Sequence, residues 1–420
     1  MLPETDKKIL IIGYVWPEPN TTAAGGRMLQ LIHFFLEQDY QITFASTAAE
    51  SEFSFDLDSL GVRKKTILLN HSSFDVFLKD LDPGIVLFDR FMTEEQFGWR
   101  VVENAPNALR ILDTEDLHSL RIARQLSFKK SIPFTEQFWL DQDQTKREMA
   151  SIYRCDLSLI ISLYEMELLT KTVKMDPNLL LHLPMMFDAN DEERQNHWLQ
   201  FDQKKDFVCI GNGKHTPNID AIHTLKKDIW PLIRKELPLA SLFVYGAYMP
   251  ESIKQLNSPK QGFYIMGHSN DANKVISQAR LNLAPLNYGA GIKGKLLSGM
   301  LNGTPSITTE IGAEGICENL QWNGIIANDV EAFAKAAILL YQNEDKWTVA
   351  RHNGTAIING FYNKVDLQKK LKDNIELLTK NLEEHRARNF IGAMLLHHSL
   401  ASTKFMSKWI AEKNSKPQSE

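Results

Sequence analysis

The stretch LNLAPLNYGAGIKGKLLSGMLNGTPSITTEIGAEG, residues 281–315, contains the pattern that decides the fold. Its apolar start, Leu281–Leu286, has the length of a buried strand, and Gly289–Gly294 then spells G-x-G-x-x-G. Glu310 follows after a second apolar run. Glycines in such a loop let backbone N–H groups approach an anion, and the helix expected over Lys293–Leu301 points the positive end of its dipole at the same place. The segment predicts either a phosphate-binding turn or a tight strand-to-helix turn without a ligand.

The same pattern is the fingerprint of dinucleotide-binding enzymes, but its position argues against an oxidoreductase that uses NAD. That fingerprint normally follows the first strand of its domain. The first strands of the two expected domains end in Gly13-Tyr14-Val15 and Gly211-Asn212-Gly213, and neither continues into the fingerprint. The sequence therefore favours binding of a different phosphate group by Gly289–Gly294, with a dinucleotide-dependent oxidoreductase as a distant alternative.

Length and composition indicate a globular protein of two domains. The chain has 420 residues, too many for one ordinary core, and is 43% hydrophobic and 24% charged. It has no apolar run long enough to cross a bilayer, and its net charge of −5 argues against a nucleic-acid partner. We expect the N-terminal MLPETDKK to be a polar lead rather than a signal peptide. Three cysteines without metal-like spacing indicate small buried residues in a reducing, cytoplasmic compartment.

Short apolar runs alternate with helical patterns along most of the chain. Such runs are typical of parallel strands buried on both faces, with helices between them. We expect strands at Lys8–Ile12, Gln41–Ala45, Gly84–Asp89, Ala108–Asp113, Leu157–Ser162, Asp206–Ile210, Ser241–Tyr245, Gly262–Met266, Leu281–Leu286 and Ser306–Thr309. A helix is expected over Asn218–Ile233, and the chain beyond about residue 329 is predicted to be helical.

The alternation predicts an α/β protein with two Rossmann-like, doubly wound domains that face a central cleft. The first domain is expected over residues 1–187, a polar linker over 188–205 and the second domain over 206–375. A helical tail over 376–420 is predicted to pack back on the first domain. Ligands of such sheets bind at the carboxyl ends of the strands, so polar residues at strand ends are the site candidates.

Five segments carry a resemblance to a known family. They are GYVWPEPNTTAAGGRMLQLIHFFLEQDYQITFAST (13–47), RILDTEDLHSLR (110–121), CDLSLIISLYEMELL (155–169), FVCIGNGKHTPNIDAIHTLKKDIWPLI (207–233) and APLNYGAGIKGKLLSGMLNGTPSITTEIGAEG (284–315). In this order they resemble the retaining GT-B glycosyltransferases of family 4, also called group 1. The resemblance extends over most of residues 8–340, and it depends on the order of the segments more than on any one of them.

The resemblance implies transfer of a sugar from a UDP- or GDP-sugar to a glycan, lipid-linked or protein acceptor, with retention of configuration and no bound metal or other cofactor. Backbone N–H groups and the cations Lys293 and Lys295 would stabilise the leaving diphosphate. His118 matches the family histidine beside the donor sugar, although a helix-capping role is the alternative. The donor-binding residues would be Gly25, Gly26, Gly211, Asn212, Gly267, Gly289, Ala290, Gly291, Ile292, Ser298 and Glu314.

Three polar residues near strand ends are candidates for the acceptor side of the cleft: Arg90, Asp113 and Asp116. For Asp116 the alternative is the N-cap of a helix. For Arg90 and the nearby Glu94 the alternative is a solvated loop.

Two departures from the family pattern bear on activity. The family usually has two glutamates eight positions apart, and Ala290 and Ser298 stand at those positions. A serine can offer a ribose hydroxyl one hydrogen bond, but not the charge-assisted pair of a carboxylate. The segment Gly211–His215 also lacks the partner of the usual Arg/Lys pair. A catalytically silent relative that acts as a binding or scaffold protein is therefore the second hypothesis.

The C-terminal segment has two interpretations. Phe390, Met394, Leu395, Leu400, Phe405 and Trp409 form a loose apolar series, with Lys404, Lys408 and Lys413 between them. A basic amphipathic helix would lie on the inner face of the membrane, near lipid-linked acceptors. The alternative, which we favour, is a helix that packs over the first domain. The final residues, NSKPQSE, are expected to be disordered.

Overall fold

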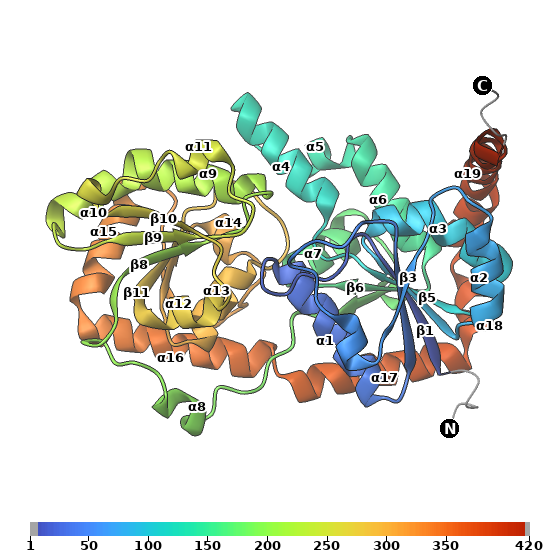
Figure 1. Cartoon of the computed structure of the whole chain (residues 1–420), viewed down its shortest axis with the longest axis horizontal. Coiled ribbons are helices and arrows are strands. Elements are labelled where there is room, and N and C mark those ends of the chain that lie inside the picture. The colour runs from blue at the N-terminus through green and yellow to red at the C-terminus, as the bar shows by residue number, and fades with distance from the viewer. Residues whose placement is uncertain (1–6, 416–420) are drawn as a thin grey trace.

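The computed structural model describes residues 7–415, without the side chains of residues 398–401 and 415. Residues 1–6 of the polar N-terminal lead and residues 416–420 of the tail lie outside the described part of the chain. Within it, the protein forms two α/β domains side by side, and the chain returns from the second domain to the first at its end (Figure 1).

The first domain is built on a seven-stranded parallel sheet in the order β3-β2-β1-β4-β5-β6-β7. The central strands β1, β4 and β5 are almost fully buried, as their continuous apolar sequences predict. The short β3 and β7 were not predicted, because RKKT and LLH are too short or too polar to stand out. The strands are β1 (Lys8–Gly13), β2 (Gln41–Ser46), β3 (Arg63–Thr66), β4 (Ile85–Asp89), β5 (Leu109–Asp113), β6 (Leu157–Ile160) and β7 (Leu180–His182).

Helices cover both faces of this sheet and bury two apolar clusters against it. The first of them begins after Thr22, whose hydroxyl accepts a hydrogen bond from the Gly25 N–H, and buries Met28, Leu31 and Ile32 at helical spacing. The helices are α1 (Ala23–Glu37), α2 (Ser73–Leu81), α3 (Phe91–Asn104), α4 (His118–Lys130), α5 (Glu136–Leu140), α6 (Asp143–Arg154) and α7 (Leu163–Glu167).

The second domain is built on a six-stranded parallel sheet in the order β10-β9-β8-β11-β12-β13. Strand β13 was not predicted. The strands are β8 (Lys205–Ile210), β9 (Leu242–Tyr245), β10 (Phe263–Gly267), β11 (Ala279–Ala284), β12 (Ser306–Thr308) and β13 (Gly324–Ile326). The helices are α9 (Thr216–Thr224), α10 (Trp230–Glu236), α11 (Glu251–Lys254), α12 (Ala272–Gln278), α13 (Gly294–Leu301), α14 (Glu310–Ala313), α15 (Val330–Gln342) and α16 (Glu344–Phe361).

The helix expected over Asn218–Ile233 is not one regular helix. A π-helical turn at Leu225–Ile229 separates α9 from α10, and Pro231 lies at the start of α10. Proline removes a backbone donor and favours the first turn of a helix, which explains why a new segment begins there.

The polar segment between the domains contains only the short helix α8 (Glu192–Asn196). Three of its residues, Asn190, Trp198 and Lys204, are nevertheless buried against the second domain, and Asn190 donates to the Met300 carbonyl. Trp198 lies against Gly303, and Lys204 donates hydrogen bonds to the Asn302 carbonyl and the Thr304 hydroxyl.

Three C-terminal helices lie along the first domain (Figure 1): α17 (Lys364–Lys380), α18 (Leu382–Arg388) and α19 (Phe390–Ser415). Lys364 pairs with Glu37 of α1, Arg386 pairs with the buried Asp156, and α19 contacts α3 and α6. Asn414 and Ser415, for which disorder was predicted, are helical.

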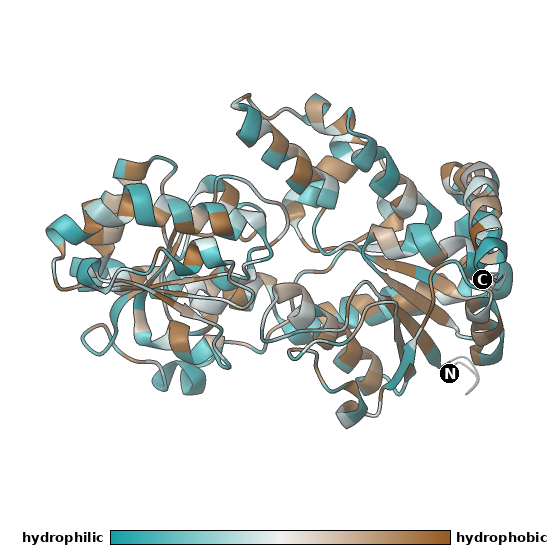
Figure 2. Cartoon of the chain, turned by 45° about the horizontal axis from the view of Figure 1, so that its top comes forward, coloured by the Kyte–Doolittle hydropathy of each residue, from teal (hydrophilic) through white to brown (hydrophobic). Residues whose placement is uncertain are grey.

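The apolar residues concentrate in the two sheets and in the helix faces that cover them (Figure 2). Within residues 7–415, each helix is too short or too polar to span a bilayer. Cys155 and Cys209 are buried as expected, whereas Cys317 is partly exposed. The prediction of two doubly wound α/β domains with a helical tail is confirmed.

Candidate functional site

The candidate site lies where loops at the carboxyl ends of the two sheets meet. The glycine loop 285–293, which connects β11 to α13, contacts the loop 114–117 that follows β5 of the first domain. The start of α13 also approaches the start of α1, since a Cβ at Gly294 would lie 2.7 Å from the Ala23 Cβ. These are the strand ends at which doubly wound sheets bind ligands.

Gly291 is the position at which the glycine loop requires a glycine. Its φ is +62°, and a Cβ there would lie 2.7 Å from the Asp116 Cβ of the first domain. Its N–H donates a 2.9 Å hydrogen bond to Glu165 Oε1, also in the first domain. The predicted anion-binding loop is therefore docked on the first domain, and one of its N–H groups is already bonded to a glutamate side-chain oxygen.

Lys293 and Lys295 both lie at this loop, but their ammonium groups have different partners. Lys293 Nζ donates to the Gly291 carbonyl at 2.9 Å, and burial lowers the pKa of this lysine to about 8. Lys295 Nζ donates to Asn218 Oδ1 at 2.6 Å, and burial also lowers its pKa. Lys295 thus faces α9 of its own domain, whereas Lys293 folds back on the loop.

The other predicted donor residues of this segment differ in burial and in the residues that they contact. Ile292 is buried in an apolar cluster that joins the second domain to Ile161 and Met185 of the first, and Ala290 packs against the core of the first domain. Ser298 is half-buried in α13. Glu314, predicted to bind the donor, accepts two hydrogen bonds, of 2.7 and 2.8 Å, from Arg124 of the first domain.

The other predicted glycines differ in how much space surrounds them. A Cβ at Gly25 would lie 2.4 Å from the backbone of Glu18, whereas Gly26 and Gly267 have no atoms within 4 Å of that position. Gly211 lies against Asn218. The neighbouring Asn212 donates to the Thr21 carbonyl across the domain interface at 3.3 Å. Gly26 and Gly267 are thus open to a ligand, and Gly25 and Gly211 permit close packing.

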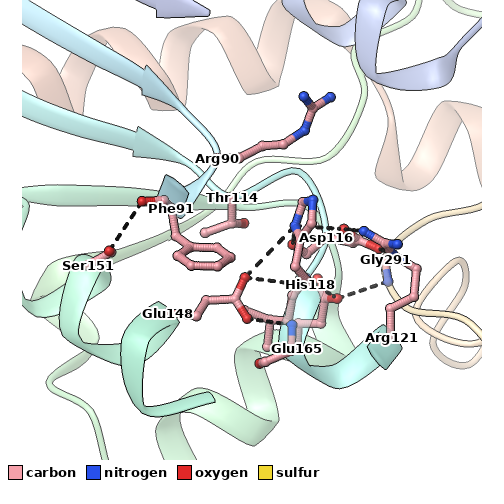
Figure 3. Close-up of polar contacts among 12 residues, drawn as sticks. Arg90, Phe91, Thr114, Asp116, His118, Arg121, Glu148, Ser151, Glu165 and Gly291 are labelled. Atoms are coloured by element: carbon pink, nitrogen blue, oxygen red, sulfur yellow. Dashed lines mark hydrogen bonds and ion pairs between the residues drawn. The ribbon is translucent and has the colours of Figure 1, made fainter. Parts of the chain in front are cut away.

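His118 is the first residue of α4 and lies in a cluster of carboxylates (Figure 3). Its Nδ1 is 3.1 Å from the Asp116 carbonyl oxygen and 3.2 Å from Asp116 Oδ1. Two acceptors facing Nδ1 require this nitrogen to carry the hydrogen, which leaves Nε2 as the acceptor. Burial lowers the pKa of His118 to about 4, against the opposing effect of Asp116, so the imidazole is neutral at pH 7.

Two buried glutamates hold the backbone around this histidine (Figure 3). Glu148 accepts hydrogen bonds from the His118 and Ser119 N–H groups and thereby caps α4. Glu165 Oε1 accepts from the Leu117 N–H at 3.0 Å and from Gly291. Burial raises the pKa of Glu148 to about 7 and that of Glu165 to about 8.

The structure corrects one acceptor-side prediction. Asp113 is fully buried, and both its carboxylate oxygens accept hydrogen bonds from Arg27, at 2.7–3.2 Å. Arg27 also donates to the Leu183 carbonyl at 2.7 Å. The polar end of β5 therefore binds α1 to the sheet, and Asp113 is not available to an acceptor hydroxyl.

Asp116 and Arg90 remain acceptor-side candidates, and the structure excludes the alternatives considered for them. Asp116 is not an N-cap, because α4 begins after Leu117; instead it pairs with Arg121 at 2.6 Å. Arg90 precedes a regular helix rather than a solvated loop, and Glu94 in that helix is buried against Arg154. The Arg90 side chain extends away from Glu148 (Figure 3), pairs with Asp89 and lies over the Tyr14 ring.

Sequence reasoning missed several residues that join the domains here. Besides Glu165 and Arg124, Tyr248 of the second domain donates a 2.9 Å hydrogen bond to Glu18. Phe53 of the first domain contacts both Tyr248 and His268, and a cavity of about 440 Å³ lies beside it. Glu165 and Glu18 lie in segments that carry the resemblance but were not singled out, whereas Arg124, Tyr248, Phe53 and His268 lie outside those segments. Arg121 and Arg124, at helical spacing after His118, gave a signal that one helix face is basic.

Taken together, the cluster offers an acceptor imidazole, cations and open glycines between two domains. Among the side chains that the structure describes, no three of His, Cys, Asp or Glu are grouped so that they could hold a metal ion. The arrangement could hold an anionic group near Lys295 and a polar group near His118.

Comparison with known proteins agrees with this architecture. The family described as "Glycosyl transferases group 1" matches residues 204–343, which include the glycine loop and both lysines. HepE of Anabaena, solved with UDP and glucose, superimposes with a TM-score of 0.64 at 12% identity, over 88% of this chain and 99% of that one. The chain has the GT-B fold.

Two further GT-B structures are similar at this level. Sucrose-phosphate synthase of Thermosynechococcus elongatus gives a TM-score of 0.62 at 15% identity, over 88% of this chain and 98% of that one. A mutant of S. aureus TarM, solved with Fondaparinux, α-GlcNAc-glycerol and UDP, gives 0.55 at 14% identity, over 71% of this chain and 57% of that one. No curated protein sequence matches. The resemblance inferred from the sequence is confirmed for the GT-B fold and the group 1 segment.

Proposed function

We propose that this GT-B protein transfers a sugar from a nucleotide-diphosphate donor to an acceptor, with retention of configuration and without a bound metal. One observation carries the proposal: the group 1 segment, with its glycine loop and lysines, lies directly against the His118 loop of the other domain. A donor bound to the loop would have its sugar near that histidine.

The chemistry of the cluster fits loss of a diphosphate. The leaving group gains negative charge, which preorganised cations and N–H groups stabilise best where water is excluded. Lys295 and Lys293 are the candidates, and an anion beside Lys293 would raise its pKa above about 8 and keep it protonated. Neutral His118, with Nε2 as acceptor, would accept a hydrogen bond from a hydroxyl of the sugar or the acceptor.

A UDP-sugar is the first donor to test and a GDP-sugar the second. The HepE and TarM structures were solved with UDP, whereas the base-facing loop of this chain gives no sequence code for the base. A glycan, lipid-linked or protein acceptor would enter on the Arg90 and Asp116 side. We place this activity in the cytoplasm.

A silent relative that binds ligands without transfer is the second candidate. Ser298 offers no carboxylate, and Glu314 is held by Arg124 rather than free to replace it. Either feature would weaken a ribose contact, so binding and transfer need separate measurement.

Calorimetric titration with UDP, GDP, ADP and NAD, with Mg²⁺ and with EDTA, tests the proposal. We expect one nucleoside diphosphate to bind equally well in both conditions, at least tenfold more weakly in Lys295→Ala, and more tightly in Ser298→Glu. Sugar transfer from the matching donor, with the anomeric configuration read by NMR, separates an enzyme from a silent relative. Absence of nucleoside diphosphate binding would reject the donor site.

A further inference from the structure

One face of α4 reaches from the first domain to the second. Gln125 donates to the Thr216 hydroxyl at 3.0 Å, and the Phe128 ring lies 5.3 Å from that of Tyr288. Arg124, on the same side of the helix, contacts the glycine loop and Glu314. The helix stands above the interface between the domains (Figure 1).

Arg124 makes the most extensive of these contacts. Its Nη1 donates to the Gly289 carbonyl at 2.9 Å and to Glu314 Oε1 at 2.7 Å, and its Nη2 donates to Glu314 Oε2 at 2.8 Å. The side chain is 5% exposed, so the ion pair is largely withdrawn from water. The pair with Glu314 raises the pKa of Arg124, which stays charged.

The first domain holds the guanidinium in position for this contact. It lies 5.2 Å from the centre of the Phe134 ring and 5.1 Å from that of Tyr164. Aromatic faces attract a guanidinium and limit its rotation, so little conformational freedom remains to be lost when it meets the second domain.

Both targets of Arg124 belong to the segment that the proposed function assigns to the donor. Gly289 is the first glycine of the G-x-G-x-x-G pattern, and Glu314 lies near the end of the segment 284–315. A single side chain of the first domain therefore contacts two separate points of this segment, the first of them two residues from the Gly291 N–H that Glu165 holds.

We propose that Arg124 is a positioning residue that fixes the donor-binding loop of the second domain when the two domains close. The inference rests on the proposed function. It differs from a direct donor contact, because Arg124 acts through Gly289 and Glu314. Without it, donor binding itself would have to order the loop, so donor affinity would fall more than the rate at saturation.

The test compares Arg124→Gln, Arg124→Lys and Glu314→Gln with Arg100→Gln. Arg100 is the matched control, since it is also buried and pairs with Asp75 at 2.6 Å, but within the first domain. We expect Arg124→Gln to raise the donor KM and the Kd for UDP at least tenfold and to change kcat less than threefold. Arg124→Lys retains the charge but not the two-pronged hydrogen-bonding geometry of the guanidinium, so its donor KM and its Kd for UDP should lie between those of the wild type and Arg124→Gln. Arg100→Gln should keep the wild-type KM.

A charge reversal gives a second, independent check. Glu314→Arg alone should weaken UDP binding, and its combination with Arg124→Glu should restore at least part of the loss. Hydrogen exchange of the amides of residues 289–293, measured without nucleotide, should be faster in Arg124→Gln and unchanged in Arg100→Gln. This measurement does not depend on the proposed activity.

The outcomes separate the two proposals. If the wild type binds UDP and Arg124→Gln binds it equally well, the inference about Arg124 is wrong and the function stands. A fall in thermal stability with unchanged KM would show that Arg124 has only a structural role. If the wild type binds no nucleotide, the proposed function fails and the inference fails with it, even if amide exchange responds.

Discussion

Glu165 and His118 lie in the same cluster, but burial gives their contributions to stability opposite dependence on pH. The pKa of Glu165 is raised to about 8, so the folded protein retains a proton that the unfolded chain loses above about 4.5. Its contribution is complete at low pH and is lost as pH rises toward 8. The pKa of His118 is lowered to about 4, so its contribution is present above about 6.5 and is lost as pH falls toward 4.

Glu165→Gln is therefore expected to reduce the loss of stability at alkaline pH. The amide oxygen can still accept from Leu117 and Gly291, but it cannot ionise. Urea unfolding at pH 5, 7 and 8.5 should show a wild-type decline over this range that is smaller in the variant by on the order of 2 kcal/mol. Part of the decline in stability should remain in Glu165→Gln, because Glu148, with a pKa of about 7, still ionises over this pH range. Glu331→Gln on the exposed face of α15 is the control, and an equal decline in Glu165→Gln would show that Glu165 is ionised throughout.

His118 should act as a neutral group in catalysis. His118→Ala is expected to lower kcat by roughly 10²- to 10⁴-fold, the usual range for loss of a positioned acid–base group, with little change in UDP affinity. Because its pKa is about 4, the wild-type rate should show no acid limb from this residue near 6.5. A pH–rate profile of sugar transfer checks both statements. An acid limb near 6.5 that disappears in His118→Gln would contradict them.

At the residue scale, the sequence predicted contacts within a segment better than contacts between domains. The G-x-G-x-x-G pattern predicted a loop in which glycine is required. The structure shows this requirement at Gly291, whose φ is positive and which the backbone of Asp116 approaches closely. Glu165 was not predictable, because Ser162-x-x-Glu165 has the spacing of a capping box, yet the carboxylate leaves its own helix for Leu117 and Gly291. Asp113 is a different case. Its position at a polar strand end predicted a contact with a ligand, but its carboxylate is instead hydrogen-bonded to Arg27 within the first domain.

At the element scale, helices and strands could be predicted where their apolar pattern is strong. Long buried strands such as β1 and β4 have continuous apolar sequences, whereas β3 is a four-residue edge strand, RKKT, without an apolar signal. The tail illustrates a different limit. One side of α19 packs on α3 and α6, and Lys404 pairs with Glu103, as the packing hypothesis requires. Yet Phe390, Phe405 and Trp409 are more than 60% exposed.

The exposed side of α19 gives the membrane hypothesis a direct test. Phe405 and Trp409 lie one turn apart, and Lys408 and Lys413 are exposed beside them. We expect co-sedimentation with vesicles containing phosphatidylserine, weakened at least tenfold in Phe405→Ser/Trp409→Ser, because each buried aromatic contributes roughly 1.5–3 kcal/mol. Leu239→Ser, which removes a single exposed leucine from the second domain, should bind as the wild type does. A wild type that stays in the supernatant would leave packing as the role of α19.

At the scale of the whole molecule, several contacts join the two domains, and two sets of them lie far apart along the chain. One is Arg124 with Glu314 and Gly289, and the other is Tyr248 with Glu18, beside Phe53 and His268. They connect different loops, so a rigid-body opening would have to break both. If closure is one equilibrium, each contact shifts it by its own free energy, and the shifts should add.

Small-angle scattering of Tyr248→Phe, Arg124→Gln and the double variant can therefore measure the closure equilibrium. Tyr248→Phe removes one hydrogen bond, about 1 kcal/mol, whereas Arg124→Gln leaves the partly buried Glu314 without its cation, on the order of 2 kcal/mol. The radius of gyration should rise in that order and be largest in the double variant, while Arg100→Gln scatters as the wild type does. Saturating UDP should reduce the differences, because a ligand that binds only the closed form restores it by mass action. Equal radii for all variants without nucleotide would mean that other contacts keep the domains closed, and the effect of Arg124 would then have to arise within the loop alone.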